Sequence, residues 1–120
     1  MHEASVTSSI VSTAIDAIRT EGLDGTVTAV HITVGVCQGL VPESMKMYFD
    51  IEKPGTPLES AELVVTIQGM VAHCSSCGVD HTLELPLMIC PDCGNPMTLV
   101  KGNELLITEI EVECDEGNAE

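Results

Sequence analysis

The chain has 120 residues, of which 44% are hydrophobic, with no Trp, one Tyr and one Phe. This length allows one compact core, with or without a small metal-bound lobe, but not two full-sized domains. Only 4 Lys and Arg residues oppose 19 Asp and Glu residues, and the resulting net charge of −15 repels phosphate backbones and anionic lipids. We therefore expect neither nucleic acid nor a membrane as a partner, but a cationic protein surface or a metal cation.

We expect neither a secretion signal nor a transmembrane segment, because no Lys or Arg precedes an apolar run at the N-terminus and the apolar runs are short. We expect the protein to be cytoplasmic. Thiols stay reduced there, so the six cysteines are predicted to be metal ligands or buried thiols rather than a disulfide framework.

The first three residues, Met1-His2-Glu3, allow two interpretations. A carboxylate at Glu3 suits the start of a helix, where the helix dipole favours it by about 0.3–1 kcal/mol. Alternatively, the α-amine of Met1 and the amide and imidazole of His2 form chelate rings around one ion, with Glu3 as a further donor. Nitrogen and oxygen donors suit Ni(II) or Cu(II) rather than zinc. Taken alone, the residues favour the helix start.

The pattern from Val6 to Ile18 predicts an amphipathic helix that Gly22 terminates. The segment TVTAVHITVGV, residues 26–36, alternates like a half-buried strand. One face of this strand would carry Thr28, Val30, Ile32, Val34 and Val36. The other face would carry Ala29, His31, Thr33 and Gly35.

Pro42 suits the first turn of a second helix, with Met45, Tyr48 and Phe49 directed inward, and PGTP at residues 54–57 ends it. AELVVTIQGM, residues 61–70, is predicted to be the next strand. After a turn at residues 101–103, ELLITEIEVEC is predicted to be the last strand. One face of this strand would carry Leu106, Thr108, Ile110 and Val112. The opposite face would carry Leu105, Ile107, Glu109 and Glu111.

These elements predict an α+β fold: a small three-stranded sheet with two helices, plus an inserted zinc-ribbon-like lobe. We expect residues 1–69 and 102–114 to form an α/β domain and residues 70–101 to form the inserted cysteine-containing domain. Residues 115–120 are predicted to be a solvated acidic tail.

The inserted lobe contains two matched motifs, Cys74-x-x-Cys77-Gly and Cys90-x-x-Cys93-Gly. A two-residue gap lets both sulfurs of one turn point at one ion, and the glycine permits the backbone angles that close the turn. Four thiolates satisfy tetrahedral zinc and leave no position for substrate or water. The motifs therefore predict a structural zinc site rather than a catalytic one, and folding of the lobe that depends on the metal.

Other interpretations of the cysteines remain open. The same pattern also suits a single iron in a rubredoxin-like electron carrier, although the scarcity of aromatic residues disfavours a redox centre. A zinc-ribbon interaction module or a pair of disulfides is also compatible with the spacing. His73 and His81 flank the turns and are expected to be exposed, with a role beside a sulfur as the alternative. Cys37 and Cys114 are predicted to be buried, inert thiols.

The combination of MHE at the N-terminus, VHITVG about thirty residues later, the paired CxxCG motifs and GNELLI resembles the HypA family of hydrogenase nickel-incorporation proteins. The resemblance covers essentially residues 1–113. It implies a nickel metallochaperone, not an enzyme, with a nickel-binding α/β domain and a zinc domain. The absence of a GxxxxGK[ST] phosphate loop agrees with a protein that performs no turnover.

The resemblance also implies site residues and partners. Nickel would be coordinated through Met1, His2 and Glu3, and zinc through Cys74, Cys77, Cys90 and Cys93. Family members act with the GTPase HypB to load nickel into the large subunit of [NiFe] hydrogenase, and some also serve urease.

Overall fold

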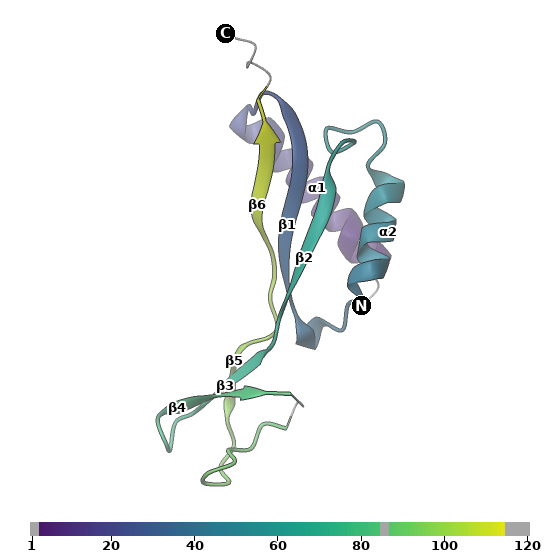
Figure 1. Cartoon of the computed structure of the whole chain (residues 1–120). Helices are drawn as coiled ribbons and strands as arrows, with labels where there is room; N and C mark the ends of the chain where they lie inside the picture. The colour runs from purple at the N-terminus through teal and green to yellow at the C-terminus, as the bar shows by residue number, and fades with distance from the viewer. Residues whose placement is uncertain (1–2, 85–86, 115–120) are drawn as a thin grey trace.

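The computed structural model of the chain describes residues 3–84 and 87–114. Its elements form two three-stranded sheets, and two helices pack on the first of them (Figure 1). In chain order they are α1 (Glu3–Glu21), β1 (Thr26–Gly35), the 3-10 helix η1 (Val36–Gln38), α2 (Pro42–Glu52), β2 (Glu62–Gln68), β3 (Met70–Cys74), β4 (Val79–Leu83), β5 (Thr98–Lys101) and β6 (Leu105–Glu113). The predicted α+β class is confirmed. The predicted acidic tail, residues 115–120, lies outside the described residues.

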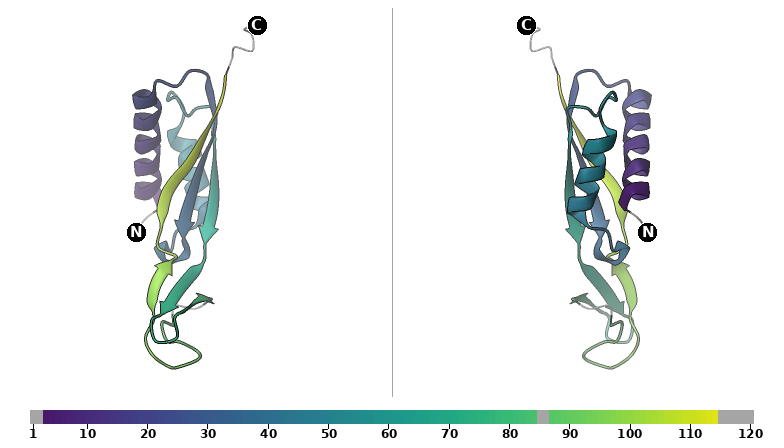
Figure 2. Two further views of the ribbon diagram at one scale, coloured as in Figure 1. Left: turned by 90° about the vertical axis from the view of Figure 1, so that its left-hand side faces the viewer. Right: turned by 90° about the vertical axis from the view of Figure 1, so that its right-hand side faces the viewer.

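The first sheet has the strand order β2-β1-β6, in which β1 is parallel to β2 and antiparallel to β6. A parallel pair needs a crossover connection, and α2 lies in it. Both helices lie against the same face of this sheet, and the other face carries no helix in the described part of the chain (Figure 2). We call this second face, which includes His31 and its cross-strand partner Glu109, the open face.

Helix α1 follows the predicted apolar period and ends where predicted. Gly22 adopts a left-handed conformation with φ +63°, which a side chain would disfavour. The N–H of Leu23 donates to the carbonyl of Ile18 at 3.3 Å and closes the last turn. The buried residues of α1 are Val6, Thr7, Ile10, Val11, Ala14 and Ile18. No helix in the two described ranges is both long and apolar enough to cross a membrane.

Helix α2 begins at Pro42, in the first-turn position that proline tolerates best. Met45 and Phe49 are fully buried in the core between the helices and the sheet, whereas Tyr48, also predicted inward, is half-buried. The helix ends at Glu52, just before the PGTP segment, as the sequence predicts.

A register shift in β1 corrects one predicted face. Between Val27 and Ala29, β1 carries Thr28 as an extra residue in its ladder with β6. An extra residue reverses the alternation beyond it. Val27 therefore joins the core, and Thr28, predicted on the same face as Val30, is only half-buried.

A second shift corrects the predicted faces of β6. Between Glu109 and Ile107, the extra residue is Thr108. Ile107 and Ile110, predicted on opposite faces, consequently pack against the same core. Leu106, predicted on the face of Ile110, is 55% exposed. The sequence pattern alone does not reveal such a shift, because it depends on the pairing with β1.

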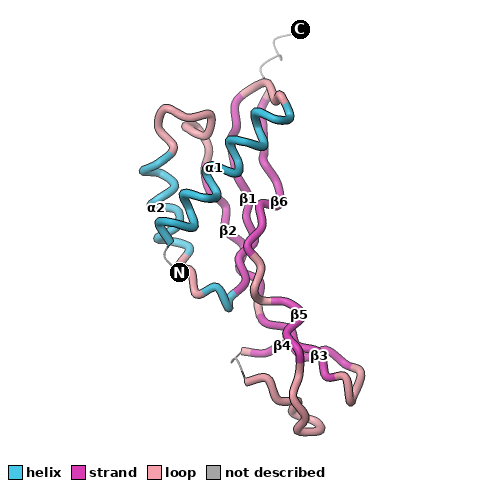
Figure 3. The backbone as a smooth tube through the Cα atoms, turned by 180° about the vertical axis from the view of Figure 1, so that it is seen from behind, coloured by secondary structure: helices cyan, strands magenta, loops and turns pink. Residues whose placement is uncertain are grey.

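The second sheet has the order β4-β3-β5, with both pairs antiparallel. These strands lie in the region predicted as a cysteine-containing lobe, and Met70, predicted at the end of a strand 61–70, begins β3 instead. The sheet lies beyond one end of the first, and the β2–β3 and β5–β6 segments run side by side between the two (Figures 1 and 3).

A close backbone approach fixes the junction between the sheets. A Cβ atom at Gly35 would lie 2.1 Å from the carbonyl carbon of Gly102, so no side chain fits there. The N–H of Gly35 donates to the carbonyl of Glu104 at 2.8 Å, and the N–H of Cys37 donates to the carbonyl of Gly102 at 2.7 Å. The end of β1 is thereby hydrogen-bonded to the turn that connects β5 with β6.

The fully buried ring of Phe49 should contribute strongly to stability. We expect Phe49→Ala to lower the free energy of unfolding by about 3–5 kcal/mol, because it removes apolar contacts and leaves a cavity. Met47→Ala is the matched control on the same helix, since Met47 is 51% exposed, and it should change stability by less than about 0.5 kcal/mol. Urea denaturation followed by circular dichroism measures both. Equal effects of the two variants would contradict the assignment of the core.

Candidate metal centre

The two CxxCG turns have matching backbone geometry. Cys74 ends β3, and Cys77 lies in the turn to β4, where the N–H of Gly78 donates to the carbonyl of Cys74 at 2.7 Å. In the second turn the N–H of Gly94 donates to the carbonyl of Cys90 at 2.9 Å. Gly78 and Gly94 have φ values of +74° and +76°. Glycine is therefore favoured at the same step of both turns.

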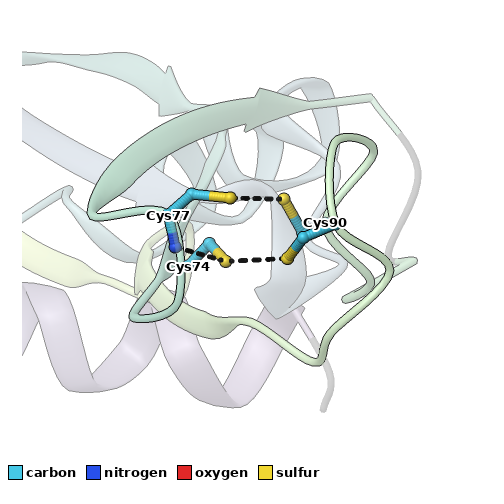
Figure 4. A group of neighbouring side chains, drawn as sticks. Cys74, Cys77 and Cys90 are labelled. Carbon is cyan, nitrogen blue, oxygen red and sulfur yellow. Dashed lines mark hydrogen bonds between the residues drawn. The ribbon is translucent and has the colours of Figure 1, made fainter.

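The turns bring all four sulfur atoms together. The Sγ atoms of Cys74 and Cys93 are 3.5 Å apart, those of Cys77 and Cys90 are 3.9 Å apart, and all four lie within 4.8 Å of one another (Figure 4). Four sulfurs around a tetrahedral zinc at about 2.3 Å would be separated by about 3.8 Å. The donor set and its spacing therefore fit one zinc ion.

The first cysteine of each turn is buried and acidic. The backbone N–H of Cys77, 3.4 Å from the Cys74 sulfur, is the main cause that lowers the pKa of Cys74 to about 7, against the raising effect of burial. Burial raises the pKa of Cys90, but hydrogen bonds from the backbone N–H groups of Cys93 and Asp92 outweigh it, and the net pKa is lowered. Each turn thus stabilises one thiolate with its own backbone.

The second cysteine of each turn behaves in the opposite way. The neighbouring Cys93 sulfur, followed by those of Cys74 and Cys90, raises the pKa of Cys77 to about 12. The backbone N–H at Asn95 lowers the pKa of Cys93, but burial and the Cys74 sulfur outweigh this, and the net pKa is raised. Four sulfurs held so close share protons unless a cation neutralises them.

The histidines near the turns differ in their surroundings. His81 is 19% exposed, and its Nε2 lies 3.6 Å from the Cys90 sulfur and 3.8 Å from the carboxylate of Asp92. His73 instead pairs through Nδ1 with Asp80 at 2.7 Å. The exposed position expected for both therefore holds better for His73, whereas His81 lies beside a sulfur, the position that the alternative requires.

The predicted N-terminal site lies only partly within the described residues, since Met1 and His2 are outside them. Glu3 is the first residue of α1, and its carboxylate accepts a hydrogen bond of 2.9 Å from the N–H of Val41, the residue that precedes α2. Glu3 therefore connects the starts of the two helices, which agrees with its interpretation as a helix-start residue.

Two predictions about cysteines outside the cluster are wrong. Cys37 and Cys114, predicted to be buried, are both exposed free thiols. Cys37 lies in η1, where the chain leaves the sheet, and Cys114 follows the last residue of β6. Neither position faces a core, because each comes after the strand pattern has ended.

The structure also gathers a group that the sequence does not reveal. His31, Glu109 and Glu111 place one imidazole nitrogen and two carboxylate oxygens within 4.8 Å of one another on the open face. The alternation of β1 puts His31 on this face, but its neighbours follow only from the register with β6.

This fold and this cluster define a small α+β protein with a four-sulfur metal-binding centre. The HypA family, described as hydrogenase and urease nickel-incorporation metallochaperones, matches residues 1–112. The chain belongs to this family, whose members are metallochaperones and hydrogenase maturation factors rather than enzymes.

Relatives of similar length support the assignment. The hydrogenase maturation factor HypA of Chloroflexus aurantiacus is 37% identical over 113 residues, covering 92% of this chain and 98% of that protein. The HypA of Aquifex aeolicus is 34% identical over 116 residues, covering 96% and 100%. That of Trichormus variabilis is 40% identical over 116 residues, covering 94% and 96%.

Solved structures share the fold. The solution structure of the Ni metallochaperone HypA from Helicobacter pylori superposes with a TM-score of 0.66 at 17% identity, covering 96% of this chain and all of that one. A second solution structure of a HypA protein gives a TM-score of 0.71 at 18% identity, covering 96% and 98%.

Zinc uptake should depend steeply on pH. With a pKa of about 12 for Cys77 and a raised pKa for Cys93, both thiols carry protons near neutrality, and a metal must displace them. We expect the apparent zinc affinity to rise by at least about tenfold per pH unit between pH 6 and 8. The dependence should steepen below the Cys74 pKa of about 7, where a further proton binds. Competition with a zinc-binding dye measures the affinity, and a flat profile would contradict four-thiolate ligation.

Removal of the metal should affect the two sheets differently. Among the described residues, the buried cluster of the second sheet consists of Ala72, Cys74, Cys90 and Met97, and it is too small to hold the sheet without the ion. We expect a chelator to abolish amide-exchange protection in β3, β4 and β5 while α1 and β1 stay protected. Hydrogen exchange before and after chelation measures this, with zinc addition as the reversal control. Uniform loss of protection would show that the sheets do not form separate domains.

Proposed function

We propose that this protein takes up Ni(II) through Met1, His2 and Glu3 and delivers it during the maturation of [NiFe] hydrogenase. The family assignment supports this proposal most directly, because its members are nickel-incorporation metallochaperones. The names of relatives point the same way: they are hydrogenase maturation factors, and the Helicobacter pylori protein is a Ni metallochaperone. Beyond the family, HypB and the hydrogenase large subunit are the proposed partners, and the cytoplasm is the proposed location.

The chemistry of the N-terminus supports the nickel site. The α-amine of Met1 and the amide and imidazole nitrogens of His2 can close fused chelate rings around one ion. Because the carboxylate of Glu3 accepts a hydrogen bond from Val41, we propose that Glu3 contributes its backbone amide as the further donor. The proposed site therefore begins next to a residue anchored on two helices.

The four cysteines have a different proposed role. A zinc ion held by Cys74, Cys77, Cys90 and Cys93 has a complete shell, so it stabilises the second sheet and takes no part in transfer. We propose residues 70–101 as the zinc-binding domain and residues 1–69 with 102–114 as the nickel-binding domain. The separation of the two sheets supports this division.

The alternative of a rubredoxin-like iron carrier shares the same four sulfurs. It would give a red oxidised protein that contains iron and no zinc, so metal analysis of the purified protein separates the two proposals. The absence of Trp and the single Phe and Tyr leave little aromatic shielding for a redox centre.

Nickel titration of the zinc-loaded protein tests the N-terminal site. We expect the native chain to bind one nickel tightly at this site. A chain with two extra residues before Met1 should bind at that site more than about 100-fold more weakly, since changes to outer partners of metal ligands alone cost about 10–100-fold. His2→Ala should behave like the extended chain. Glu3→Gln should stay within about threefold of the native chain, because it keeps the backbone amide.

Calorimetry and absorbance give the affinity and the geometry, and unchanged zinc content is the control for folding. Equal nickel affinity of the native and extended chains would overturn the N-terminal site. A large loss in Glu3→Gln would instead identify the carboxylate as the ligand. In cells, unchanged hydrogenase maturation by His2→Ala would contradict the proposed delivery.

A further inference from the structure

The open face of the first sheet presents a histidine at its centre. His31 lies on β1, the middle strand, and its side chain is 27% exposed. The residues on either side of it, Val30 and Ile32, are buried in the core beneath the helices. Since side chains alternate along a strand, the imidazole is held on the open face. Figure 2 shows both helices against the opposite face of this sheet.

The strand register places two carboxylates beside this imidazole. His31 pairs directly with Glu109 of β6, and Glu111 pairs with Ala29, two residues away from His31 on the same face. The Nε2 atom of His31 lies 2.5 Å from Oε2 of Glu111. The imidazole nitrogen and one oxygen of each glutamate lie within 4.8 Å of one another.

The backbone of this group is well fixed, whereas its side-chain ends are accessible. Ile110, between the two glutamates, packs against the core, so β6 cannot rotate without disturbing it. Glu111 is 48% exposed. Small side-chain rotations therefore suffice to bring the three donor atoms to the spacing that ions bound at about 2.0–2.2 Å require.

We propose that His31, Glu109 and Glu111 form a second site for a divalent transition-metal ion, distinct from the N-terminus and from the four cysteines. One imidazole nitrogen with two carboxylate oxygens is a donor set for Zn(II) or Ni(II). Two negative charges next to a neutral imidazole are balanced by the +2 charge of the ion. Three protein ligands leave positions for water, so the ion exchanges with solvent.

The proton balance of this site is simple. In the metal-free protein a proton lies between Nε2 of His31 and Oε2 of Glu111. A metal ion takes the place of that proton, which moves to Nδ1 of the neutral imidazole, and binds both atoms together with an oxygen of Glu109. A purely structural ion pair would bind no metal ion. Metal uptake is therefore the measurable property that distinguishes the proposed site from such a pair.

The test uses the full, zinc-loaded chain with His2→Ala, which removes the proposed terminal nickel site, and Ni²⁺ as the probe. We expect calorimetry to show one remaining nickel ion, bound at least about tenfold more weakly after His31→Gln, Glu109→Gln or Glu111→Gln. Glu62→Gln is the matched control. Glu62 of β2 pairs with Ala29 on the strand edge opposite β6. The substitution removes the same charge from the same face, so it should change the nickel affinity by less than about twofold.

Localisation of the ion comes from paramagnetic broadening. Ni²⁺ should broaden the imidazole resonances of His31 and the amide resonances of residues 109–111 before those of the cysteine turns. Zinc content and circular dichroism check that each variant folds. If His31→Gln fails to fold, Glu109→Gln decides the matter, because its exposed carboxylate lies outside the core.

The outcomes separate this site from the terminal one. No nickel binding in the His2→Ala chain, or equal affinity in the parent and the Glu109→Gln and Glu111→Gln variants, overturns the His31 site and leaves the terminal proposal standing. If the native and His2→Ala chains bind the same number of nickel ions and the His31 resonances broaden, the terminal site is contradicted and the His31 site stands.

Discussion

The convergence of four sulfur atoms is the constraint on which the second sheet depends. Its strands have five, five and four residues, and in the part of the chain that the structure describes its buried cluster consists of four residues, two of which are Cys74 and Cys90 of the sulfur cluster. Burial of so little apolar surface does not offset the conformational entropy of ordering three strands. Zinc binding in small modules contributes about 10–16 kcal/mol, which is enough to change that balance. The ion requires both turns at once, so it also determines the path of the chain between them.

The first sheet is stabilised by an apolar core, and contacts at the junction attach it to the second sheet. A continuous apolar core joins both helices to β1, β2 and β6. Where β1 ends, the contact between Gly35 and Gly102 and the hydrogen bond from Cys37 attach the start of η1 to the turn between β5 and β6. A few residues further on, Val41 holds the carboxylate of Glu3. The start of α1 is thus connected to the turn between β5 and β6 through two hydrogen bonds and the chain segment 37–41.

The sequence predicts those features that depend on local spacing. The helical period from Val6 to Ile18, the stop at Gly22 and the start at Pro42 are each set by residues within one or two turns, and all three are confirmed. The CxxCG turns belong to the same class, because their geometry is contained in five residues. The convergence of Cys74 with Cys93, 19 positions apart, followed only from the chemistry of the ligands.

Features that depend on pairing between distant strands were missed or predicted wrongly. The extra residues Thr28 and Thr108 change the faces of β1 and β6, and neither has a local signal, since threonine is common in regular strands. The neighbours of His31 lie about 80 positions further along the chain and become visible only with the register. Cys37 was predicted to be buried because free cysteine usually is, whereas its place in a short 3-10 helix outside the core exposes it.

The proposed metal sites differ in whether their ligand shells are closed, and this difference decides what each is suited to do. A shell closed by four thiolates offers no position through which an incoming ligand can attack the metal, so exchange requires that a protein ligand leave first. Such a site suits a permanent structural ion. Four nitrogen donors in one plane at the N-terminus leave the positions above and below the ion open, and His31 with its two glutamates leaves positions for water. The ligands of another protein can attack the ion at these positions and replace its donors one at a time. Release to a partner therefore becomes a series of small steps, and the strongly negative chain, at −15, attracts divalent ions to those open positions.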